Sequence, residues 1–548
     1  MPGRSGAGSR TRSRIRLKAI SLLGATLALA VTAMFSPAAN AADEQIYGSG
    51  SSWSANAMNQ WIADEAAHGV PVSFNVSSSG QGRTDFSYYQ NDFANSDIAF
   101  QGTDPLTGQA DNNGTRDFAY IPIVAGGTAL MYHLNQGNSQ VNNLRLSGTT
   151  VAKIFTGKIT MWNDPAITAD MNGHALPAKR IQVVVESNGS GTTFQFTDWM
   201  VKQFGSIWAS YAGANKATSY YPIHASNITA QDGDSQVAQT ITSSGFDGAI
   251  GYVQYSYALN AHYPVANVLN AAGYYTAPNP YNAAVALTRA QLNMSNPNDP
   301  TTYLTQDLTN VYTNNDPRSY PLSSYSYSII PIGPNDSRTN ANRAQTFADF
   351  AYYFLCQGQD SMPQLGYSPL TINLVQAAFN QVAKYSHIQP SAIQNKNPAT
   401  CNNPTYYPQN PSINRLAQID PVPPDCDKVG QGPCAFANTA NPNSNGNGNG
   451  SGNGSGNGSG GGGSGDTSAA NNTDAADPGS GSAVGDSGSG SGSTSEGSTA
   501  TDLAASRSHD VTTVFGVLSV VELLLVLLVP AVVATTIARR QRQHNGGN

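Results

Sequence analysis

The sequence has little positive charge, few cysteines and no cluster of metal-binding side chains. Its 548 residues include 27 Lys and Arg against 34 Asp and Glu, and the 8 His are scattered along the chain. Nine of the basic residues lie near the two ends, which leaves 18 basic against 33 acidic residues and a net charge of about −15 between them. This negative charge argues against nucleic acid or an anionic lipid surface as the main partner. The scattered histidines predict no metal site, and no motif predicts a cofactor.

The first 41 residues have the pattern of an export signal. Six basic residues precede an apolar run from Ala19 to Phe35, and Ala39-Asn40-Ala41 offers small residues for cleavage. We therefore expect residues 1–41 to be removed and the mature protein to be exported.

The other end predicts a membrane anchor. Residues 511–538 include an apolar run long enough to cross a bilayer, and three arginines follow it directly. The tail, 539–548, is then cytoplasmic, and the bulk of the chain lies on the outer face. The Gly/Ser/Asn-rich segment 436–510 has no apolar periodicity and predicts a disordered tether. Glu522 within the span is either a contact for a partner or a tolerated protonated acid.

All four cysteines lie in the exported part, which predicts two disulfides. Three pairings are possible, and we favour Cys426–Cys434, which closes a short Pro/Gly-rich loop, together with Cys356–Cys401. None of the four directly follows the signal peptide, so the C-terminal helix rather than a lipid is the expected anchor.

The globular part, residues 42–435, alternates apolar β-like runs with helical stretches. This alternation predicts an α/β fold with largely parallel sheets, and its length suits two lobes. The stretch 274–327 is rich in Tyr, Asn and Pro and is interpreted as a loop-rich insertion of unidentified role. The expected strands are 72–76, 98–100, 120–124, 181–185 and 249–253, and the expected helices are 54–67, 193–204, 340–356 and 371–385.

Three Ser/Gly turns run straight into helical stretches and are the strongest functional signal. They are Gly48-Ser49-Gly50-Ser51-Ser52-Trp53, Ser79-Gly80-Gln81-Gly82 and Asn188-Gly189-Ser190-Gly191-Thr192. A helix N-terminus offers unpaired N–H groups and a partial positive charge, and a Gly/Ser turn lets an oxyanion approach it. Together with the carboxylate of Asp97, the turns predict a site for a small tetrahedral oxyanion. The alternative is that these serines are plain helix caps.

Seven segments resemble, in the same order, the phosphate-binding proteins of ABC transporters. These proteins are members of the periplasmic-binding-protein superfamily, and this chain would be a membrane-anchored, actinobacterial-like variant. The resemblance covers about residues 45–388. The segments that carry it are Gly48–Trp53, Ser79–Gly82, Asp92–Asp97, Tyr120–Gly127, Gly189–Phe194, Gly248–Val253 and Gln364–Leu370.

The resemblance implies a type II periplasmic-binding-protein fold, in which two α/β lobes joined by a hinge close on a buried ligand. The first lobe would combine residues 44–122 with 255–400, and the second would comprise 123–254. The ligand is expected to be inorganic phosphate or a related oxyanion, delivered to an ABC permease. The implied ligand-binding residues are Ser52, the backbone of Trp53, Ser79, Asp97, Ser190, Gly191 and Thr192.

Within this set, Asp97 can only accept hydrogen bonds. It would accept the proton that hydrogen phosphate carries and that sulfate lacks.

One position departs from the family in a way that affects charge. The family usually has Arg where this chain has Glu186, and Asp two residues later, where this chain has Asn188. A carboxylate beside a dianion has the wrong sign for binding. Either Glu186 points away, or Arg83 supplies the positive charge, or the ligand is not phosphate.

Two other functions remain open from the sequence. One is a membrane-tethered sensor or surface receptor for a different small ligand on the same fold. The other is a phosphoester hydrolase, although the Gly189-Ser190-Gly191 turn lacks the Gly-x-Ser-x-Gly spacing of a nucleophile elbow. We expect a binding protein and not an enzyme.

Overall fold

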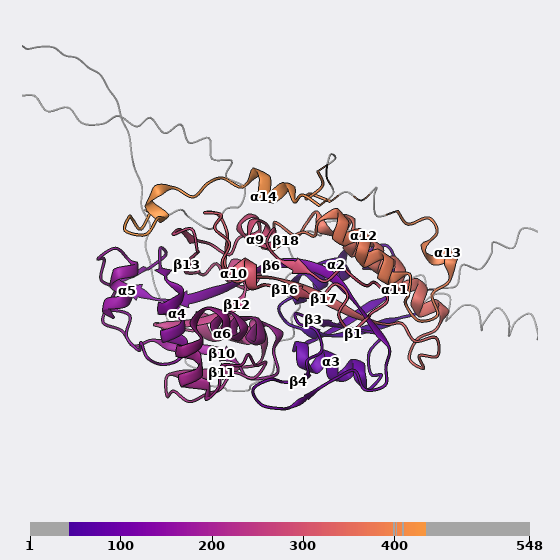
Figure 1. Cartoon of the computed structure of the whole chain (residues 1–548), viewed down its shortest axis with the longest axis horizontal. Coiled ribbons are helices and arrows are strands. Elements are labelled where there is room, and N and C mark those ends of the chain that lie inside the picture. The colour runs from indigo at the N-terminus through magenta and orange to yellow at the C-terminus, as the bar shows by residue number, and fades with distance from the viewer. Residues whose placement is uncertain (1–42, 398–400, 402, 408–409, 411, 435–548) are drawn as a thin grey trace, which may run out of the picture. The chain divides into compact units, whose positions relative to one another are not determined.

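A computed structural model describes residues 43–434, except 398–400, 402, 408–409 and 411 (Figure 1). The predicted signal peptide, tether and C-terminal span lie outside the described residues. None of the described helices is both long and apolar enough to cross a membrane.

A nine-stranded mixed sheet runs through the described domain. Parallel pairs occupy its two outer parts, and β6 and β17 at its centre pair antiparallel with each other and with the strands beside them. The expectation of largely parallel sheets was therefore only partly right. The order is β11 (Ile228–Gln231), β10 (Gln182–Glu186), β12 (Ala249–Gln254), β6 (Phe118–His133), β17 (Ser323–Pro331), β3 (Phe93–Ser96), β1 (Ile46–Ser51) and β2 (Val72–Ser77), with β18 (Tyr367–Ser368) also on β6.

The long strand β6 joins the two halves of the sheet. Its first part, Phe118–Gly127, pairs with β17, and its second part, Thr128–His133, pairs with β12. In Figure 1 the elements around β10 and β12 lie to the left of β6 and those around β1 and β3 to the right. The partner strand of β6 changes between Gly127 and Thr128, a few residues beyond the expected limit of the first lobe at residue 122.

All four helices expected from the sequence are present. The four expected helices are α2 (Ala55–Ala66), α6 (Gly191–Ala212), α11 (Ala341–Leu355) and α12 (Ile372–Val382), and α6 extends eight residues beyond the predicted end. The others are α3 (Ser79–Ser87), α4 (Gly148–Phe155), α5 (Pro165–Asp170), α7 (Gly233–Thr242), α8 (Tyr255–Ala261), α9 (Pro280–Leu287), α10 (Thr309–Tyr312), α13 (Pro390–Ile393) and α14 (Arg415–Ile419).

Small sheets surround the main one. They are β9 (Arg145–Leu146) with β13 (Asn267–Leu269) and β14 (Tyr275–Thr276), and the pairs β4 (Gly102–Thr103) with β5 (Ala110–Asp111), β7 (Asn135–Gln136) with β8 (Ser139–Gln140), and β15 (Gln291–Leu292) with β16 (Gln306–Asp307).

Two local predictions were wrong. The run 98–100 is not a strand, because β3 ends at Ser96, whose hydroxyl bonds to the backbone of Ile98 and turns the chain out of the sheet. The end of the supposed insertion, from Ser323 onward, is the central strand β17, which is buried along its whole length. Its alternating Ser and Tyr hid a core strand, since serines are usually exposed.

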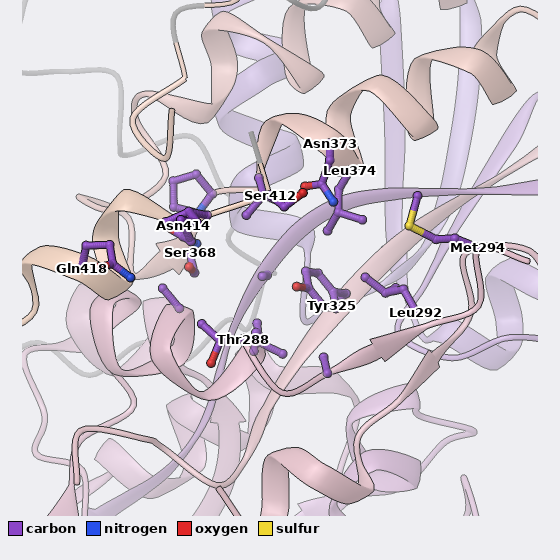
Figure 2. A pocket seen from close by; sticks show the side chains of 17 residues that line it. Thr288, Leu292, Met294, Tyr325, Ser368, Asn373, Leu374, Ser412, Asn414 and Gln418 are labelled. Atoms are coloured by element: carbon purple, nitrogen blue, oxygen red, sulfur yellow. The ribbon is translucent and has the colours of Figure 1, made fainter. Parts of the chain in front are cut away.

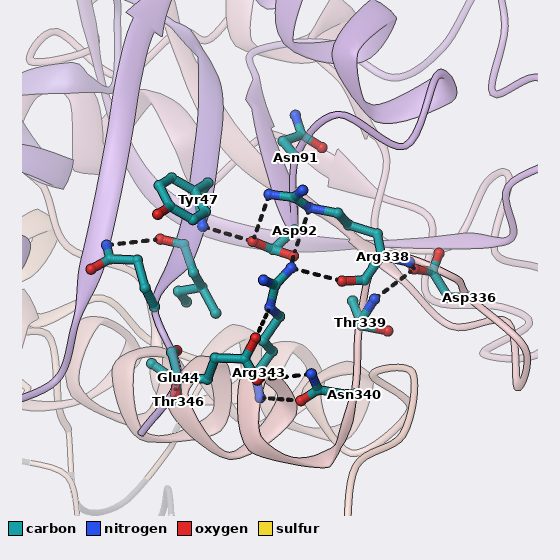
Figure 3. Close-up of polar contacts among 12 residues, drawn as sticks. Glu44, Tyr47, Asn91, Asp92, Asp336, Arg338, Thr339, Asn340, Arg343 and Thr346 are labelled. Carbon is teal, nitrogen blue, oxygen red and sulfur yellow. Dashed lines mark hydrogen bonds and ion pairs between the residues drawn. The ribbon is translucent and has the colours of Figure 1, made fainter. Parts of the chain in front are cut away.

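A charged network fixes the beginning of the described chain beside β3. The carboxylate of Asp92, directly before β3, accepts the N–H of Tyr47 at 2.8 Å and the guanidinium groups of Arg338 at 3.1 Å and Arg343 at 3.2 Å (Figure 3). Arg343 also donates to Glu44 at 2.8 Å. These contacts hold β1 and β3 in place against α11, and both strands lead directly into the candidate site.

Both favoured disulfides are present. Cys356 is bonded to Cys401, and Cys426 is bonded to Cys434. The guanidinium of Arg145 donates to the carbonyls of Cys426 and Gln431, so the small disulfide loop is held against β9.

Candidate functional site

The second and third Ser/Gly turns meet by direct backbone contact. The N–H of Gly80 donates to the carbonyl of Gly189 at 2.8 Å. A methyl group added to Gly191 would lie 2.5 Å from the hydroxyl oxygen of Ser79 and 2.8 Å from a carboxyl oxygen of Asp97. Only glycine fits at position 191, because this approach brings the start of α6 against the start of α3. The starts of the two helices, where main-chain N–H groups lack partners within the helix, therefore lie against each other.

Asp97 lies at the centre of this junction and is held by three hydroxyls. Its Oδ1 accepts hydrogen bonds from Ser51 and Ser326, each at 2.7 Å, and its Oδ2 accepts one from Ser79 at 3.0 Å. The side chain is 2% exposed. Burial raises the pKa of the Asp97 carboxyl, and the three hydroxyls, with the charge of Arg83, oppose that rise.

Ser52, which was expected to donate to the ligand, is hydrogen-bonded to the carboxyl group of Asp234. Its hydroxyl donates to Oδ2 of Asp234 at 2.5 Å and accepts the N–H of the same residue at 3.1 Å. The other oxygen of Asp234 accepts the N–H of Gln254 at 2.6 Å. Burial raises the pKa of Asp234 to about 7, against the lowering effect of these hydrogen bonds. The first turn therefore contacts the start of α7.

Trp53 forms a buried wall beside the first turn. Its indole N–H donates to the hydroxyl of Thr128 at 3.1 Å, and its carbonyl accepts the hydroxyl of Tyr367 at 2.7 Å. The ring is 1% exposed.

In the third turn, Ser190 is a helix cap. Its hydroxyl accepts the N–H of Thr193 at 3.1 Å, and its N–H donates to the carbonyl of Ser219 at 2.9 Å. Capping does not remove it from the site, because the hydroxyl proton is still available. Thr192, in the first turn of α6, is 2% exposed.

Glu186 points into the site rather than away from it. It ends β10, is 1% exposed, and has two carboxyl oxygens that accept no hydrogen bond from the described residues. Burial, the carboxyls of Asp234 and Asp97, and weaker opposing effects of the Ser190 and Thr192 hydroxyls together raise its pKa well above the usual value. The first of the three explanations for this position, that Glu186 faces elsewhere, does not fit this geometry.

Arg83 lies one turn into α3 and is already paired. Its Nε donates to Asp111 at 2.7 Å and its Nη1 to the hydroxyl of Ser96 at 2.7 Å, and the residue is 2% exposed. Its charge still acts on Asp97, whose pKa it lowers. Arg83 therefore acts on Asp97 through its charge, and its direct ion-pair partner is the carboxylate of Asp111.

Three site residues were missed from the sequence: Ser51, Asp234 and Ser326. Ser51 belongs to the first turn, but the family resemblance implied its neighbour Ser52 as the ligand-binding residue. Asp234 follows Gly233 at the start of α7, and this Asp-Gly-Asp sequence after β11 was a fourth turn of the same kind. Ser326 could not be found, because the strand that carries it was not recognised.

A separate pocket lies between α9, β15, α12 and the segment before α14. It has a volume of about 350 Å³ and is lined by Tyr325, Leu292, Met294, Asn373 and Asn414, among others (Figure 2). None of the described residues that line it is charged. It is a poorer candidate for an anion than the junction around Asp97.

Comparisons with known proteins agree with this assignment of fold. A family model described as a PBP superfamily domain matches residues 36–357. The phosphate-binding protein PstS of Xylella fastidiosa (strain Temecula1) is 30% identical over 332 residues, which cover 60% of this chain and 83% of the relative. The phosphate-binding protein PstS 3 of Mycobacterium tuberculosis (strain H37Rv) is 33% identical over 227 residues, 41% of this chain. That match spans only 57% of the mycobacterial protein's length.

Among solved structures, a phosphate-binding protein from Stenotrophomonas maltophilia is similar, with a TM-score of 0.47 and 19% identity. The similarity covers 66% of this chain and 98% of that protein.

Proposed function

Because the chain belongs to the PBP superfamily and is a relative of the PstS phosphate-binding proteins, we propose that it binds inorganic phosphate outside the cytoplasm for delivery to an ABC importer. The observation that supports this most directly is the environment of Asp97. A buried carboxylate surrounded by the hydroxyls of Ser51, Ser79 and Ser326, where two helices begin, can accept a proton from a tetrahedral oxyanion while N–H groups bind its oxygens.

The proposed ligand-binding residues are those implied by the family resemblance, with Asp234 added. Ser52, Ser79, Ser190 and Thr192 offer hydroxyls, and Trp53 and Gly191 offer backbone N–H groups. Asp97 and Asp234 are the acceptors. Arg83 is proposed to act through its charge and not by contact.

The two-lobe division, 44–122 with 255–400 against 123–254, is part of the proposal. The contacts of Gly80 with Gly189 and of Ser52 with Asp234 then join one lobe to the other over the ligand. The described conformation is the closed one in this interpretation.

Calorimetry on residues 42–435 with phosphate, arsenate, sulfate and nitrate tests the function. We expect one phosphate per chain, similar binding of arsenate and no heat from sulfate or nitrate. No heat from any of the four anions would refute an oxyanion function.

The C-terminal anchor and the outer location are proposed from the sequence alone. Truncation after residue 510 should release a folded, ligand-binding protein into the medium, because the removed segment contains the predicted span. Protein that stays in the membrane fraction after this truncation would require another anchor.

A sensor or receptor role on the same fold is the second candidate, and the predicted span of residues 511–538 favours it. Loss of the associated permease separates the two roles. It abolishes phosphate uptake if the protein serves an importer and leaves signalling intact if it is a sensor.

A further inference from the structure

Three buried carboxyl groups face the proposed ligand site, and they differ in the hydrogen bonds that they accept. Asp97 accepts three hydroxyl hydrogen bonds, and Asp234 accepts bonds from Ser52 and Gln254. Glu186 is equally buried but accepts none from the described residues. An ionised carboxylate in that state is strongly disfavoured, because it has lost water and the nearby hydroxyls of Ser190 and Thr192 offset that loss only in part.

No cation in the described part of the site compensates for Glu186. The guanidinium of Arg83 is hydrogen-bonded to Asp111 and Ser96 and not to Glu186. A phosphate dianion added to three carboxylates would meet repulsion that the helix N-termini only partly offset. Protons are the remaining means of reducing this charge.

We propose that Glu186, with Asp234, carries a proton in the ligand complex, so that the site takes up a proton when it closes on phosphate. This inference rests on the proposed function. A protonated Glu186 is a donor as well as an acceptor, and its hydroxyl can donate to a ligand oxygen. Proton transfer between Glu186 and the bound phosphate leaves the charge of the complex unchanged, so the observable quantity is the proton taken up with the ligand.

The groups that face Glu186 identify which charges can change. Asp234 lies on α7, Asp97 follows β3, and the hydroxyls of Ser190 and Thr192 lie at the start of α6. Tyr252 on β12 accepts the N–H of Glu186 at 3.3 Å, and Tyr257 lies on α8.

Burial raises the pKa of both tyrosines well above 10, so they stay neutral in ordinary buffers. On β11, Gln231 lies beside Glu186 in the sheet and has no charge. The carboxyls are therefore the groups that titrate, with the nearby cation of Arg83 constant.

Proton uptake on binding follows because the site has to open before the ligand can enter. Glu186, Asp97 and Ser52 are at most 4% exposed, so a ligand can enter only when the contacts that cover them separate. In an open state the Glu186 carboxyl meets water and is ionised at neutral pH. Closing buries it again beside an anion, and this requires a proton.

The test compares wild type, Glu186→Gln and the control Glu65→Gln as full-length proteins in detergent. Glu65 is another buried glutamate, on α2 and paired with His68, away from the site. Phosphate affinity is measured by calorimetry from about pH 5.5 to about pH 8.5, in buffers with different heats of ionisation, which also count the protons taken up.

We expect wild type and the Glu65→Gln protein to take up about one proton more per phosphate near pH 8 than Glu186→Gln does. The affinity advantage of Glu186→Gln should grow up to about tenfold per pH unit at high pH and vanish at low pH. Parallel pH profiles for wild type and Glu186→Gln would overturn the inference and leave phosphate binding intact. If wild type binds no phosphate at any pH, the proposed function itself fails.

Folding of Glu186→Gln is not a condition of the test. Near pH 8 free phosphate is almost entirely dianionic, so wild type alone must take up about one proton per phosphate bound. An uptake near zero overturns the inference without any variant.

Discussion

The hydroxyl of Ser52 lies 2.5 Å from the carboxyl of Asp234, although 182 residues separate them in the chain. Ser52 follows β1 and Asp234 lies at the start of α7 after β11, so this bond joins segments from the two outer parts of the nine-stranded sheet. Both residues are buried. In the closed conformation proposed above, this contact and the one between Gly80 and Gly189 join the two lobes.

The first prediction concerns pH and stability. The pKa of Asp234 is raised to about 7 in the folded protein from 3.8, so the folded state binds its proton more tightly than the unfolded state does. Ionisation of buried Asp234 destabilises the folded protein. This destabilisation is absent below about pH 4, grows as the pH rises and reaches its full value above about pH 7. Asp234→Asn should therefore gain stability relative to wild type at pH 8, by on the order of a few kcal/mol, and much less at pH 5.

Thermal melting at the two pH values measures this difference, with the exposed Asp360→Asn as control. A pH-independent difference between wild type and Asp234→Asn would contradict the assignment.

Asp97→Asn should weaken phosphate binding and reduce discrimination against sulfate. An amide keeps the size of the side chain, but its NH₂ group opposes the hydroxyls that now donate to Asp97, and it cannot accept a ligand proton on that side. Loss of a hydrogen bond to a charged group corresponds to roughly a tenfold to hundredfold loss of affinity. Competition calorimetry with both anions measures the effect, and an unchanged phosphate-to-sulfate ratio would remove Asp97 from the ligand site.

Gly191→Ala should prevent closure with little change in the fold of each half. The added methyl would lie 2.5 Å from Ser79 Oγ and 2.8 Å from Asp97 Oδ2, so the start of α6 has to withdraw from α3. We expect phosphate affinity to fall by at least about a hundredfold, because several charge-assisted hydrogen bonds are lost together.

Gly245→Ala is the matched control, since a methyl group there meets no atom within 4 Å. Calorimetry and small-angle scattering with and without phosphate report binding and closure. Normal closure by Gly191→Ala would show that the described approach of the two helices is not the ligand-bound one.

Substitutions at Arg83 distinguish an electrostatic role of this residue in phosphate binding from a structural role in the fold. Arg83→Ala removes a positive charge from the neighbourhood of Asp97 and leaves Asp111 without its partner. We expect a tens-fold loss of phosphate affinity and a lower melting temperature. In the double variant Arg83→Ala/Asp111→Ala the melting temperature should recover, because the unpaired carboxylate is gone, while the affinity should not. Recovery of both would limit Arg83 to a structural role.

The sequence predicted most of the fold because its helices and outer strands follow regular apolar patterns. Strands β2, β10 and β12 and helices α2 and α11 lie within a few residues of their expected limits. Strand β17 was not predicted from the sequence, because a run such as Ser323–Tyr327 is buried by tertiary contacts that no local pattern encodes.

The site was predicted in part for the same reason. Gly/Ser turns before helices are local, so Ser79 and Gly191 could be recognised. The partners Ser326 and Asp234 come from distant segments, and their roles depend on how the sheet brings those segments together. The direction of Glu186 is likewise set by the packing of β10 against β12 and α7, which a single sequence does not reveal.

The contact between Gly80 and Gly189 limits how this protein can change its ligand over evolutionary time. The two segments touch through main-chain atoms, with the N–H of one on the carbonyl of the other and no side chain between them. Substituting a side chain can enlarge a site whose walls are side chains, but at the contact between Gly80 and Gly189 there is none to shorten. Accommodation of a bulkier relative of the ligand, such as an organic ester, would need an insertion or a shift of the loop itself. Point mutations can therefore adjust charge and protonation at this site far more readily than its size.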